Sequence, residues 1–445
     1  MEPQVLTINP LAVLLLAAMV LVALTSTRQN AVKALFTSAA FLPLGQQFVV
    51  FGVHFQFFRI VLAACFFRAL VRQDFVGFRF NLLDKVFLAW ALVGMLCESL
   101  RGQPQNAFGF AYNALGTYFV VRFLLSDVNE VTAHLQFLAW VIFGVGLCMF
   151  VEFAMHHNPL AVFGGVLEVP EIRDGRVRCQ GPFRSSNVAG GFGSTLFPLM
   201  AGLWMSGEGR KRAAALGMVG CAAASYFSNS SSPYLCILVS LVGLAMWKIR
   251  NRMSLVRRGL VCALIALAIV MKAPLWYVLA KGGDLIGGSS WHRAFIIDLT
   301  VHHFSDWWLM GADHTSAWAS NFPKLAIDPT QLDITNQYVA QALQGGLLSL
   351  LLFITILILC FKIVGQALDC ADCVPFHEKL TWALGVTLAA QCTEFFSIYY
   401  FDQIQVFLFW LFALFGSLSA FLIHEEETSQ EAPASDVLAQ ISILT

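Results

Sequence analysis

Long apolar runs, separated by short polar stretches, occupy most of the chain. A membrane span needs roughly 20 mostly apolar residues, and about 13 segments approach this requirement. One of them, 35–53, contains Pro43, Gly45 and two glutamines, so we predict a broken or re-entrant helix there and twelve or thirteen spans in all. The predicted spans are 11–25, 35–53, 56–71, 86–98, 107–125, 133–154, 188–206, 213–229, 233–249, 259–275, 341–363, 380–399 and 404–423.

Basic residues concentrate in a few of the polar stretches, and this distribution predicts which side of the membrane each loop faces. The loops at 207–212 and 248–258 are the densest in Lys and Arg, and 68–85 carries further basic residues. Because short cytoplasmic loops are enriched in these residues, we place all three on the cytoplasmic side. Counting spans from them puts the loops 155–187 and 276–340 on the opposite, non-cytoplasmic face.

The composition agrees with a membrane-embedded chain. Of 445 residues, 58% are hydrophobic and only 12% are charged, whereas soluble domains average about 25% charged residues. The formal net charge of zero gives no basis for nucleic-acid binding. We therefore expect an all-α polytopic transmembrane domain over residues 1–423, followed by an acidic, polar cytoplasmic tail at 424–445 that we predict to be disordered.

The eleven cysteines do not indicate a metal site. Most lie inside apolar runs, where cysteine behaves as a small buried hydrophobe. CADC, at 370–373, is followed by His377 and resembles half of a zinc motif, but no second cysteine pair accompanies it. We expect no metal and no cofactor.

The stretch RVRCQGPFRSSN, at 176–187, places arginines on the predicted non-cytoplasmic side, against the usual charge distribution. One interpretation is a loop whose arginines pair with acidic residues nearby. The other is an anion site, because the guanidinium groups of Arg178 and Arg184 bind phosphate oxygens bidentately. Asn187 would cap the following helix, whose N-terminus also favours an anion.

A second group of candidate residues lies in the long loop at 276–340. The segment WHRAFIIDLTVHHF, 291–304, has the pattern of an amphipathic helix in the membrane interface, with Trp291 in an aromatic belt or stacked on a sugar. An interfacial position of this helix is compatible with Arg293 facing a substrate-binding site. Further along, Asp313, His314 and Asp333 are candidate general bases, although a solvated loop carries such residues too.

Four stretches occur in a characteristic order along the chain: TYFVVRFLL at 117–125, RDGRVRCQGPFRSSN at 173–187, SSWHRAFIIDL with the later LMGAD, and TNQYVAQALQGGLLSLLLF at 335–353. In this order they resemble the O-antigen ligase and O-antigen polymerase superfamily of envelope proteins. The resemblance covers about residues 107–360. It implies a membrane fold of the type C glycosyltransferase class with a large periplasmic loop.

The resemblance also implies a reaction. Members of the family transfer a glycan from an undecaprenyl-diphosphate carrier to another glycan, a lipid core or a protein, without a metal. Periplasmic arginines bind the diphosphate, and a histidine activates the acceptor hydroxyl. By position, Arg293 matches the arginine of the loop helix, Arg178 matches the arginine before the Gly-Phe turn, and Asn336 and Tyr338 match the closing motif.

The chain departs from the family pattern at two positions. Many members have a Ser-Arg pair after the serine-rich turn, but here Ser232 is followed by Pro233. Many also have His-Asn in the closing motif, where this chain has Thr335 and Asn336. Asp313 or His314 would then have to replace the usual base, and Arg178 and Arg184 would supply the missing charge.

These departures favour a polymerase of capsule or exopolysaccharide repeat units in the bacterial inner membrane, with its active site facing the periplasm. Arg293, Asp313 and His314 are the expected catalytic residues. The expected substrate-binding residues are Arg178, Arg184, Asn187, Trp291, Asn336 and Tyr338. The expected partners are the lipid-linked oligosaccharide, membrane lipid and a chain-length regulator or flippase.

Two alternatives remain. A ligase would use the same donor with a different acceptor, such as lipid A core. A transporter would carry ionisable groups inside its spans, and Glu394 is the main candidate of that kind.

Overall fold

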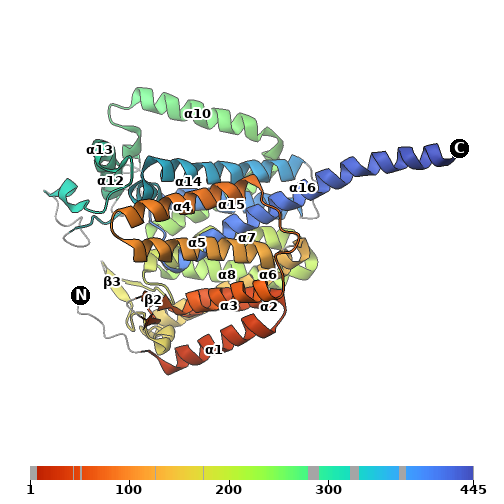
Figure 1. Ribbon diagram of the computed structural model, residues 1–445. Coiled ribbons are helices and arrows are strands. Elements are labelled where there is room, and N and C mark those ends of the chain that lie inside the picture. The colour runs from red at the N-terminus through yellow and green to blue at the C-terminus, as the bar shows by residue number, and fades with distance from the viewer. Residues whose placement is uncertain are drawn as a thin grey trace.

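The computed structural model describes residues 8–43, 45–50, 53–125, 127–173, 175–278, 290–320, 330–369 and 377–443, and it is 77% helical (Figure 1). The helices are α1 (Pro10–Thr25), α2 (Arg28–Phe41), α3 (Phe57–Val71), α4 (Leu82–Leu100), α5 (Pro104–Leu124), α6 (Val128–Met155), α7 (Ser186–Met205), α8 (Lys211–Phe227), α9 (Ser231–Ala245), α10 (Met253–Val270), α12 (Ser290–His302), α13 (Phe304–Trp307), α14 (Gln337–Asp369), α15 (Glu378–Glu394) and α16 (Gln403–Ile443). Two short antiparallel hairpins complete the fold: β1 (Gln47–Val50) with β2 (Val53–Gln56), and β3 (Glu171–Arg173) with β4 (Arg176–Arg178).

Helices of the length and composition needed to cross a membrane are present. By these criteria five stretches of the described chain qualify, at Val128–Met155, Ser186–Met205, Ser231–Val270, Gln337–Asp369 and Gln403–Ile423. Each predicted span also coincides with a helix, apart from 35–53. The protein is therefore mostly helical, with candidate membrane-spanning helices.

The segment predicted to be broken is indeed interrupted, although by a hairpin and not by a re-entrant helix. α2 ends at Phe41, just before Pro43, which has no backbone N–H to continue a helix. The chain then turns at Gly45 into β1 and β2. A Cβ at Gly45 would lie 2.7 Å from the carbonyl oxygen of Gly165, so only glycine permits this approach.

Close backbone contact between helices holds the centre of the bundle together. α6 packs on α8, and α7 lies between α8, α9 and α15. Where α6 crosses α8, a Cβ at Gly146 would come within 2.7 Å of the Gly220 backbone. Small residues at helix crossings are the usual device of membrane bundles, because lipid supplies little hydrophobic drive between helices.

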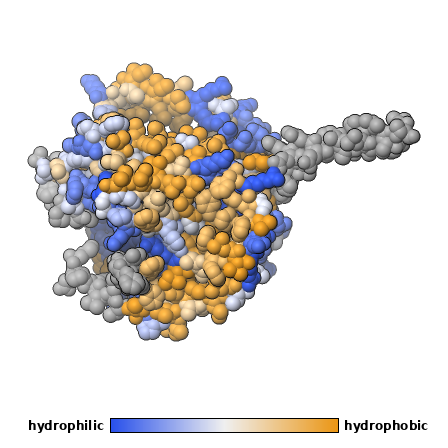
Figure 2. Space-filling view, viewed as in Figure 1, coloured by the Kyte–Doolittle hydropathy of each residue, from blue (hydrophilic) through white to orange (hydrophobic). Residues whose placement is uncertain are grey.

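The surface also fits an apolar environment. Hydrophobic side chains cover most of the middle of the face in Figure 2, and hydrophilic ones gather mainly towards its two ends. α10 stands apart from the rest of the bundle (Figure 1) and has no buried residue along its whole length. An exposed helix of this composition is consistent with the candidate membrane-spanning stretch Ser231–Val270, of which α10 is part.

The two loops predicted to face the periplasm lie at the same end of the bundle. α12, α13 and β3 are all found at the left of Figure 1, opposite the C-terminus, and we call this the loop end. The amphipathic helix predicted at 291–304 is present as α12. The last helix, α16, begins at Gln403 and is assigned up to Ile443.

A glycine pair docks the long loop onto a kink in α14. Gly346 has φ +70° and breaks the helix, and Gly311 has φ +83° in the turn that follows α13. The backbone N–H of Ala312 donates to the carbonyl of Leu343 (2.9 Å), and that of Leu347 donates to Trp308 (2.8 Å). A Cβ at Gly311 would overlap the Leu343 carbonyl oxygen, so this junction requires glycine.

We predict that Gly311→Ala lowers the free energy of unfolding by more than about 2 kcal/mol, because it combines a left-handed backbone with a steric clash. Thermal melting of the purified protein in detergent measures this. Gly365→Ala, in the open part of α14, is the control and should melt at the same or a slightly higher temperature. Equal melting temperatures of Gly311→Ala and wild type would contradict the conclusion that this junction requires glycine.

Candidate active site

The turn between α8 and α9 is the point where the arginine-rich stretch docks. Asn229 Nδ2 donates to the carbonyl of Val177 (2.5 Å), and the backbone N–H of Cys179 donates to the carbonyl of Phe227 (2.9 Å). β4 is therefore fixed against the turn that leads into α9.

Arg178 is buried and points towards this turn. Its Nη2 donates to Asn187 Oδ1 (2.5 Å), and the same oxygen accepts from Ser230 Oγ (2.9 Å). Its Nη1 lies 3.6 Å from Glu171 Oε2, on a side chain that is 52% exposed. Arg178 thus reaches the residue preceding α9 through Asn187, and it keeps one partner that faces solvent.

A buried carboxylate on α6 shapes the turn that follows Arg178. Glu152 is fully buried and accepts the backbone N–H groups of Gln180 (3.2 Å) and Gly181 (2.7 Å). Gly181 has φ +56°, which lets the chain reverse there. Glu152 therefore positions the arginine-rich stretch, a role that its sequence context did not reveal.

Glu394, at the end of α15, is the central acidic group of the site. It is fully buried, and its oxygens accept from Ser232 Oγ (3.2 Å) and Cys236 Sγ (2.6 Å), both on the first turns of α9. α7 passes so close that a Cβ at Gly191 would lie 3.0 Å from Glu394 Oε1. The carboxylate is thus enclosed by three helices.

Arg293, on α12, is near enough to Glu394 for their charges to interact. Burial lowers the pKa of Arg293, and the negative charge of Glu394 opposes that shift. Arginine stays cationic at any physiological pH even so. The predicted catalytic arginine therefore lies beside the α9 start, the same place that Arg178 reaches from β4.

The closing-motif residues connect α14 to the end of α15. Asn336 is buried, and its Oδ1 caps α14 by accepting the backbone N–H groups of Tyr338 (2.9 Å) and Val339 (3.1 Å). Tyr338 Oη donates to the carbonyl of Cys392 (3.2 Å), and Gln337 N–H donates to Phe395 (2.8 Å). These contacts hold the backbone on either side of Glu394.

The two predicted bases have different surroundings. Asp313 Oδ2 accepts from Arg101 Nε (3.0 Å), and Arg101 also donates to the carbonyl of Gln344 (2.9 Å). This links Asp313 to α4 and to the kink of α14. His314, the next residue, is exposed.

Two further predicted binding residues lie on the surface. The Arg184 side chain is 76% exposed, and its Nη1 is 4.0 Å from Asp402 Oδ2. Trp291 is about half exposed and stacks on Phe295, with ring centroids 4.7 Å apart. Arg184 therefore faces Asp402, on the loop before α16, while Arg178 reaches the start of α9.

His292 is a further titratable residue of this region, and no motif in the sequence indicated it. It precedes Arg293 on α12, and its Nε2 is buried without a hydrogen-bond partner among the described residues. Burial lowers its pKa; the charge of Asp333 opposes this shift and that of Arg293 adds to it. Only its position beside Arg293 could have drawn attention to it.

The comparisons with known proteins assign no family. No protein-family model matches the chain, and no curated protein matches it in sequence. The CADC stretch at 370–373 lies outside the described residues. The fold and the site therefore define a helical protein with candidate membrane-spanning helices and an arginine-lined site at its loop end.

We predict that His292 lowers the stability of the folded protein at acidic pH. Its folded pKa lies below the ordinary value of 6.5, so the unfolded chain binds the proton more readily, and stability falls as the pH drops below about 6.5. The melting temperature of wild type should fall more than that of His292→Gln between about pH 7.5 and pH 5.5. His302→Gln, on the same helix but 71% exposed, should behave like wild type. An equal acid-induced fall in all three proteins would contradict the prediction.

Proposed function

We propose that the protein is a polytopic membrane glycosyltransferase of twelve or thirteen spans that polymerises glycan repeat units. It would take a glycan from an undecaprenyl-diphosphate carrier and join it to a lipid-linked acceptor glycan. The site would face the periplasm of a bacterial inner membrane, and the loop end would be the periplasmic end.

The observation that carries this proposal is the approach of two arginines to the start of one helix. Arg178 reaches α9 through its hydrogen bond to Asn187, which also accepts from Ser230, and Arg293 interacts with the charge of Glu394, which accepts from Ser232 of α9. The N-terminus of a helix itself carries a partial positive charge and has unpaired N–H groups. Two guanidinium groups beside it form an arrangement suited to a diphosphate.

The charge distribution around Arg178 is compatible with an anionic ligand. The charge of Glu394 interacts with that of Arg293, whereas Arg178 faces Glu171, which is half exposed and 3.6 Å away. A diphosphate bound at Arg178 would replace this weak surface pair with a stronger, charge-assisted contact. The negative Glu171 side chain would then turn towards solvent.

In the reaction, the acceptor hydroxyl attacks C1 of the donor sugar, and the bond from C1 to the diphosphate oxygen breaks with its electron pair leaving on the diphosphate. Arg178 and Arg293 would neutralise the charge that develops there, which fixed cations do without reorganising. The hydroxyl proton would pass to Asp313 or His314. Attack from the face opposite the leaving group inverts the configuration at C1.

Transport is less well supported. Glu394 is an ionisable group within a predicted span, as a carrier requires, but it is the last residue of α15 and is bonded to the first turns of α9. Carriers usually hold such groups near the middle of the membrane. Its place at a helix end favours chemistry at the membrane surface.

We predict that Arg293→Ala reduces polymer formation by at least about 100-fold, the usual effect of removing one group that stabilises developing charge. Because the variant leaves Glu394 buried without its cation, Arg293→Lys is the second test: it keeps the charge, loses the forked geometry, and should still lose most activity. Arg176→Ala, exposed on the same hairpin as Arg178, is the control. Full polymer length from folded Arg293→Ala would overturn the mechanism.

Reconstitution separates the polymerase from the ligase. Purified protein in vesicles with a lipid-linked repeat unit should yield a ladder of products without lipid A core. Gel electrophoresis of the products measures this. Transfer of single units that requires lipid A core would instead identify a ligase.

A further inference from the structure

α10 is held at its two ends and stands apart from the bundle between them (Figure 1). At one end it follows η3 (Met246–Arg252), a short 3-10 helix that joins it to α9. At the other end η4 (Leu275–Tyr277) packs on α12, where Trp276 Nε1 donates to Asp298 Oδ1 (3.2 Å). Because no residue of α10 is buried, the helix is exposed on the side towards the bundle as well as on its outer side.

The interval between α10 and the bundle has to be filled by apolar material when the protein lies in a membrane. α9 and α10 follow each other along the chain but do not pack along their lengths. α9 also keeps large apolar side chains exposed, namely Leu238, Leu241 and Val242. α10 has 18 residues and rises about 27 Å at roughly 1.5 Å per residue, close to the roughly 30 Å of a bilayer core. Acyl chains of phospholipids therefore fit the interval in both length and composition.

A basic segment, residues 246–258, lies where α9 passes into α10. It contains five basic residues and no acidic one. Four of its side chains are exposed and have no hydrogen-bond or ion-pair partner in the part of the chain that the structure describes: Lys248, Arg252, Arg257 and Arg258. Positive charge is therefore available directly beside the exposed apolar face of α10.

Contacts with the start of α15 hold the basic segment in place. Arg250 Nη2 lies 3.7 Å from Glu378 Oε2, and the guanidinium carbon of Arg250 is 4.0 Å from the centre of the Trp247 ring. Trp382 Nε1 donates to the carbonyl of Gly243 (2.9 Å), near the end of α9. A basic loop that only orients the chain in the membrane needs no such contacts. The fixed geometry therefore indicates a preorganised binding surface.

A second basic loop, 207–212, approaches the same place. Burial lowers the pKa of His377, and the charges of Lys379 and Arg210 lower it further, while that of Glu378 opposes the shift. Arg210 is therefore close to the start of α15, which also contacts the basic segment. Basic residues from two loops gather here, and their mutual repulsion favours the binding of an anion.

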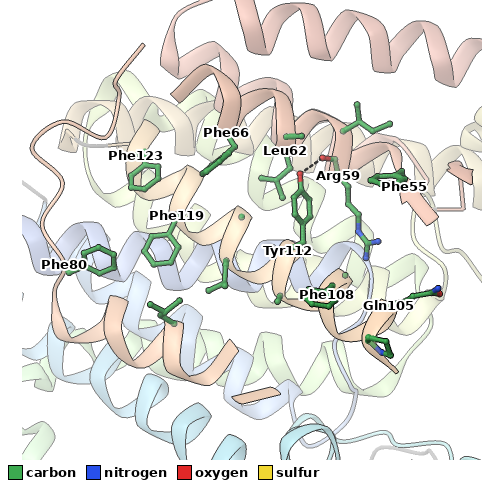
Figure 3. Close-up of a pocket in the computed structure, with 18 residues that line it drawn as sticks. Phe55, Arg59, Leu62, Phe66, Phe80, Gln105, Phe108, Tyr112, Phe119 and Phe123 are labelled. Carbon is green, nitrogen blue, oxygen red and sulfur yellow. Dashed lines mark hydrogen bonds between the residues drawn. The ribbon is translucent and has the colours of Figure 1, made fainter. Parts of the chain in front are cut away.

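The apolar groove between α3 and α5 differs from this surface (Figure 3). Its volume is about 1060 Å³, and nearly all of its wall is aromatic or aliphatic. Arg59, which lines the groove, donates from Nε to Asn113 Oδ1 (3.0 Å) and is near enough to Asp402 for their charges to interact. The groove therefore accepts apolar chains in general, and its wall does not select a headgroup.

We infer that an anionic phospholipid binds between α10 and the bundle, with its acyl chains along α10 and its phosphate at the basic segment. Guanidinium groups bind phosphate oxygens, and each basic residue near a membrane surface favours anionic over neutral lipid. α15 runs from Glu378, beside the basic segment, to Glu394 in the candidate active site. The lipid site is therefore at the opposite end of this helix from the proposed reaction and does not depend on it.

The test is binding of phosphatidylglycerol to the purified full-length protein in detergent, measured by native mass spectrometry. Phosphatidylcholine with the same acyl chains should bind at least about tenfold more weakly, because its headgroup has no net charge. Glycerol 3-phosphate, which has the phosphate but no acyl chains, should not displace phosphatidylglycerol at equal concentration. Equal binding of the two lipids, or displacement by glycerol 3-phosphate, would overturn the inference.

Variants locate the headgroup. The double variant Arg257→Gln/Arg258→Gln should weaken phosphatidylglycerol binding at least about tenfold. The matched control is Arg173→Gln/Arg176→Gln, which removes two exposed arginines from the β3–β4 hairpin at the loop end and changes the net charge equally. Phosphatidylglycerol should raise the melting temperature of wild type and of the control, but not that of the double variant. Unchanged binding in the double variant, or an equal loss of binding in the control, would overturn the site.

A second copy of the chain is the alternative occupant of the exposed face of α10. The same spectra would then contain a dimer that persists after detergent exchange has removed the lipid. Such a dimer, together with equal binding of phosphatidylglycerol and phosphatidylcholine, would assign the face to protein contact and overturn the lipid site. The expected species is instead a single chain with bound phosphatidylglycerol.

Discussion

Carboxylates buried in an apolar helical bundle must have donors or cations beside them, and this requirement organises both ends of the molecule. Asp84 accepts from Tyr118 Oη (2.6 Å) and pairs with Arg122 (3.1 Å), which ties α4 to α5. At the loop end, Glu152 accepts two backbone N–H groups and Glu394 accepts from Ser232 and Cys236. A buried charge without such partners costs several kcal/mol, so each carboxylate fixes the segments that supply them.

The same requirement joins the long loop to the bundle. α12 packs through Ile296 against an apolar cluster that includes Val339 and Leu343 of α14. Arg293 adds a charge interaction with Glu394 to this packing. Displacement of α12 would remove this favourable charge interaction and leave Glu394 with only its donors Ser232 and Cys236. The position of α12 therefore depends both on the apolar cluster and on the charge of Glu394.

The lengths of the apolar runs were sufficient to predict most of the helices but not the side chains that connect them. Every predicted span except 35–53 is a helix, since a run of apolar residues needs only its own length to be recognised. Arg178 and Asn187 were selected together and are in contact, because both lie in one short stretch. Glu152 and Ser232 form hydrogen bonds with segments that are distant in sequence. A single sequence contains no signal for such long-range pairing. His292 was passed over because its neighbour Arg293 carried the resemblance.

The two arginines Arg178 and Arg184 of the arginine-rich stretch contact different parts of the fold. Arg178 is buried and directed to the start of α9, whereas Arg184, six residues later, is exposed and faces Asp402. Gly181 reverses the chain between them, so one loop presents cations in two directions. Asp402 is also near enough to Arg59 of α3 for their charges to interact. Arg184 therefore links the loop to the segment before α16, and of the two arginines only Arg178 is directed to the start of α9.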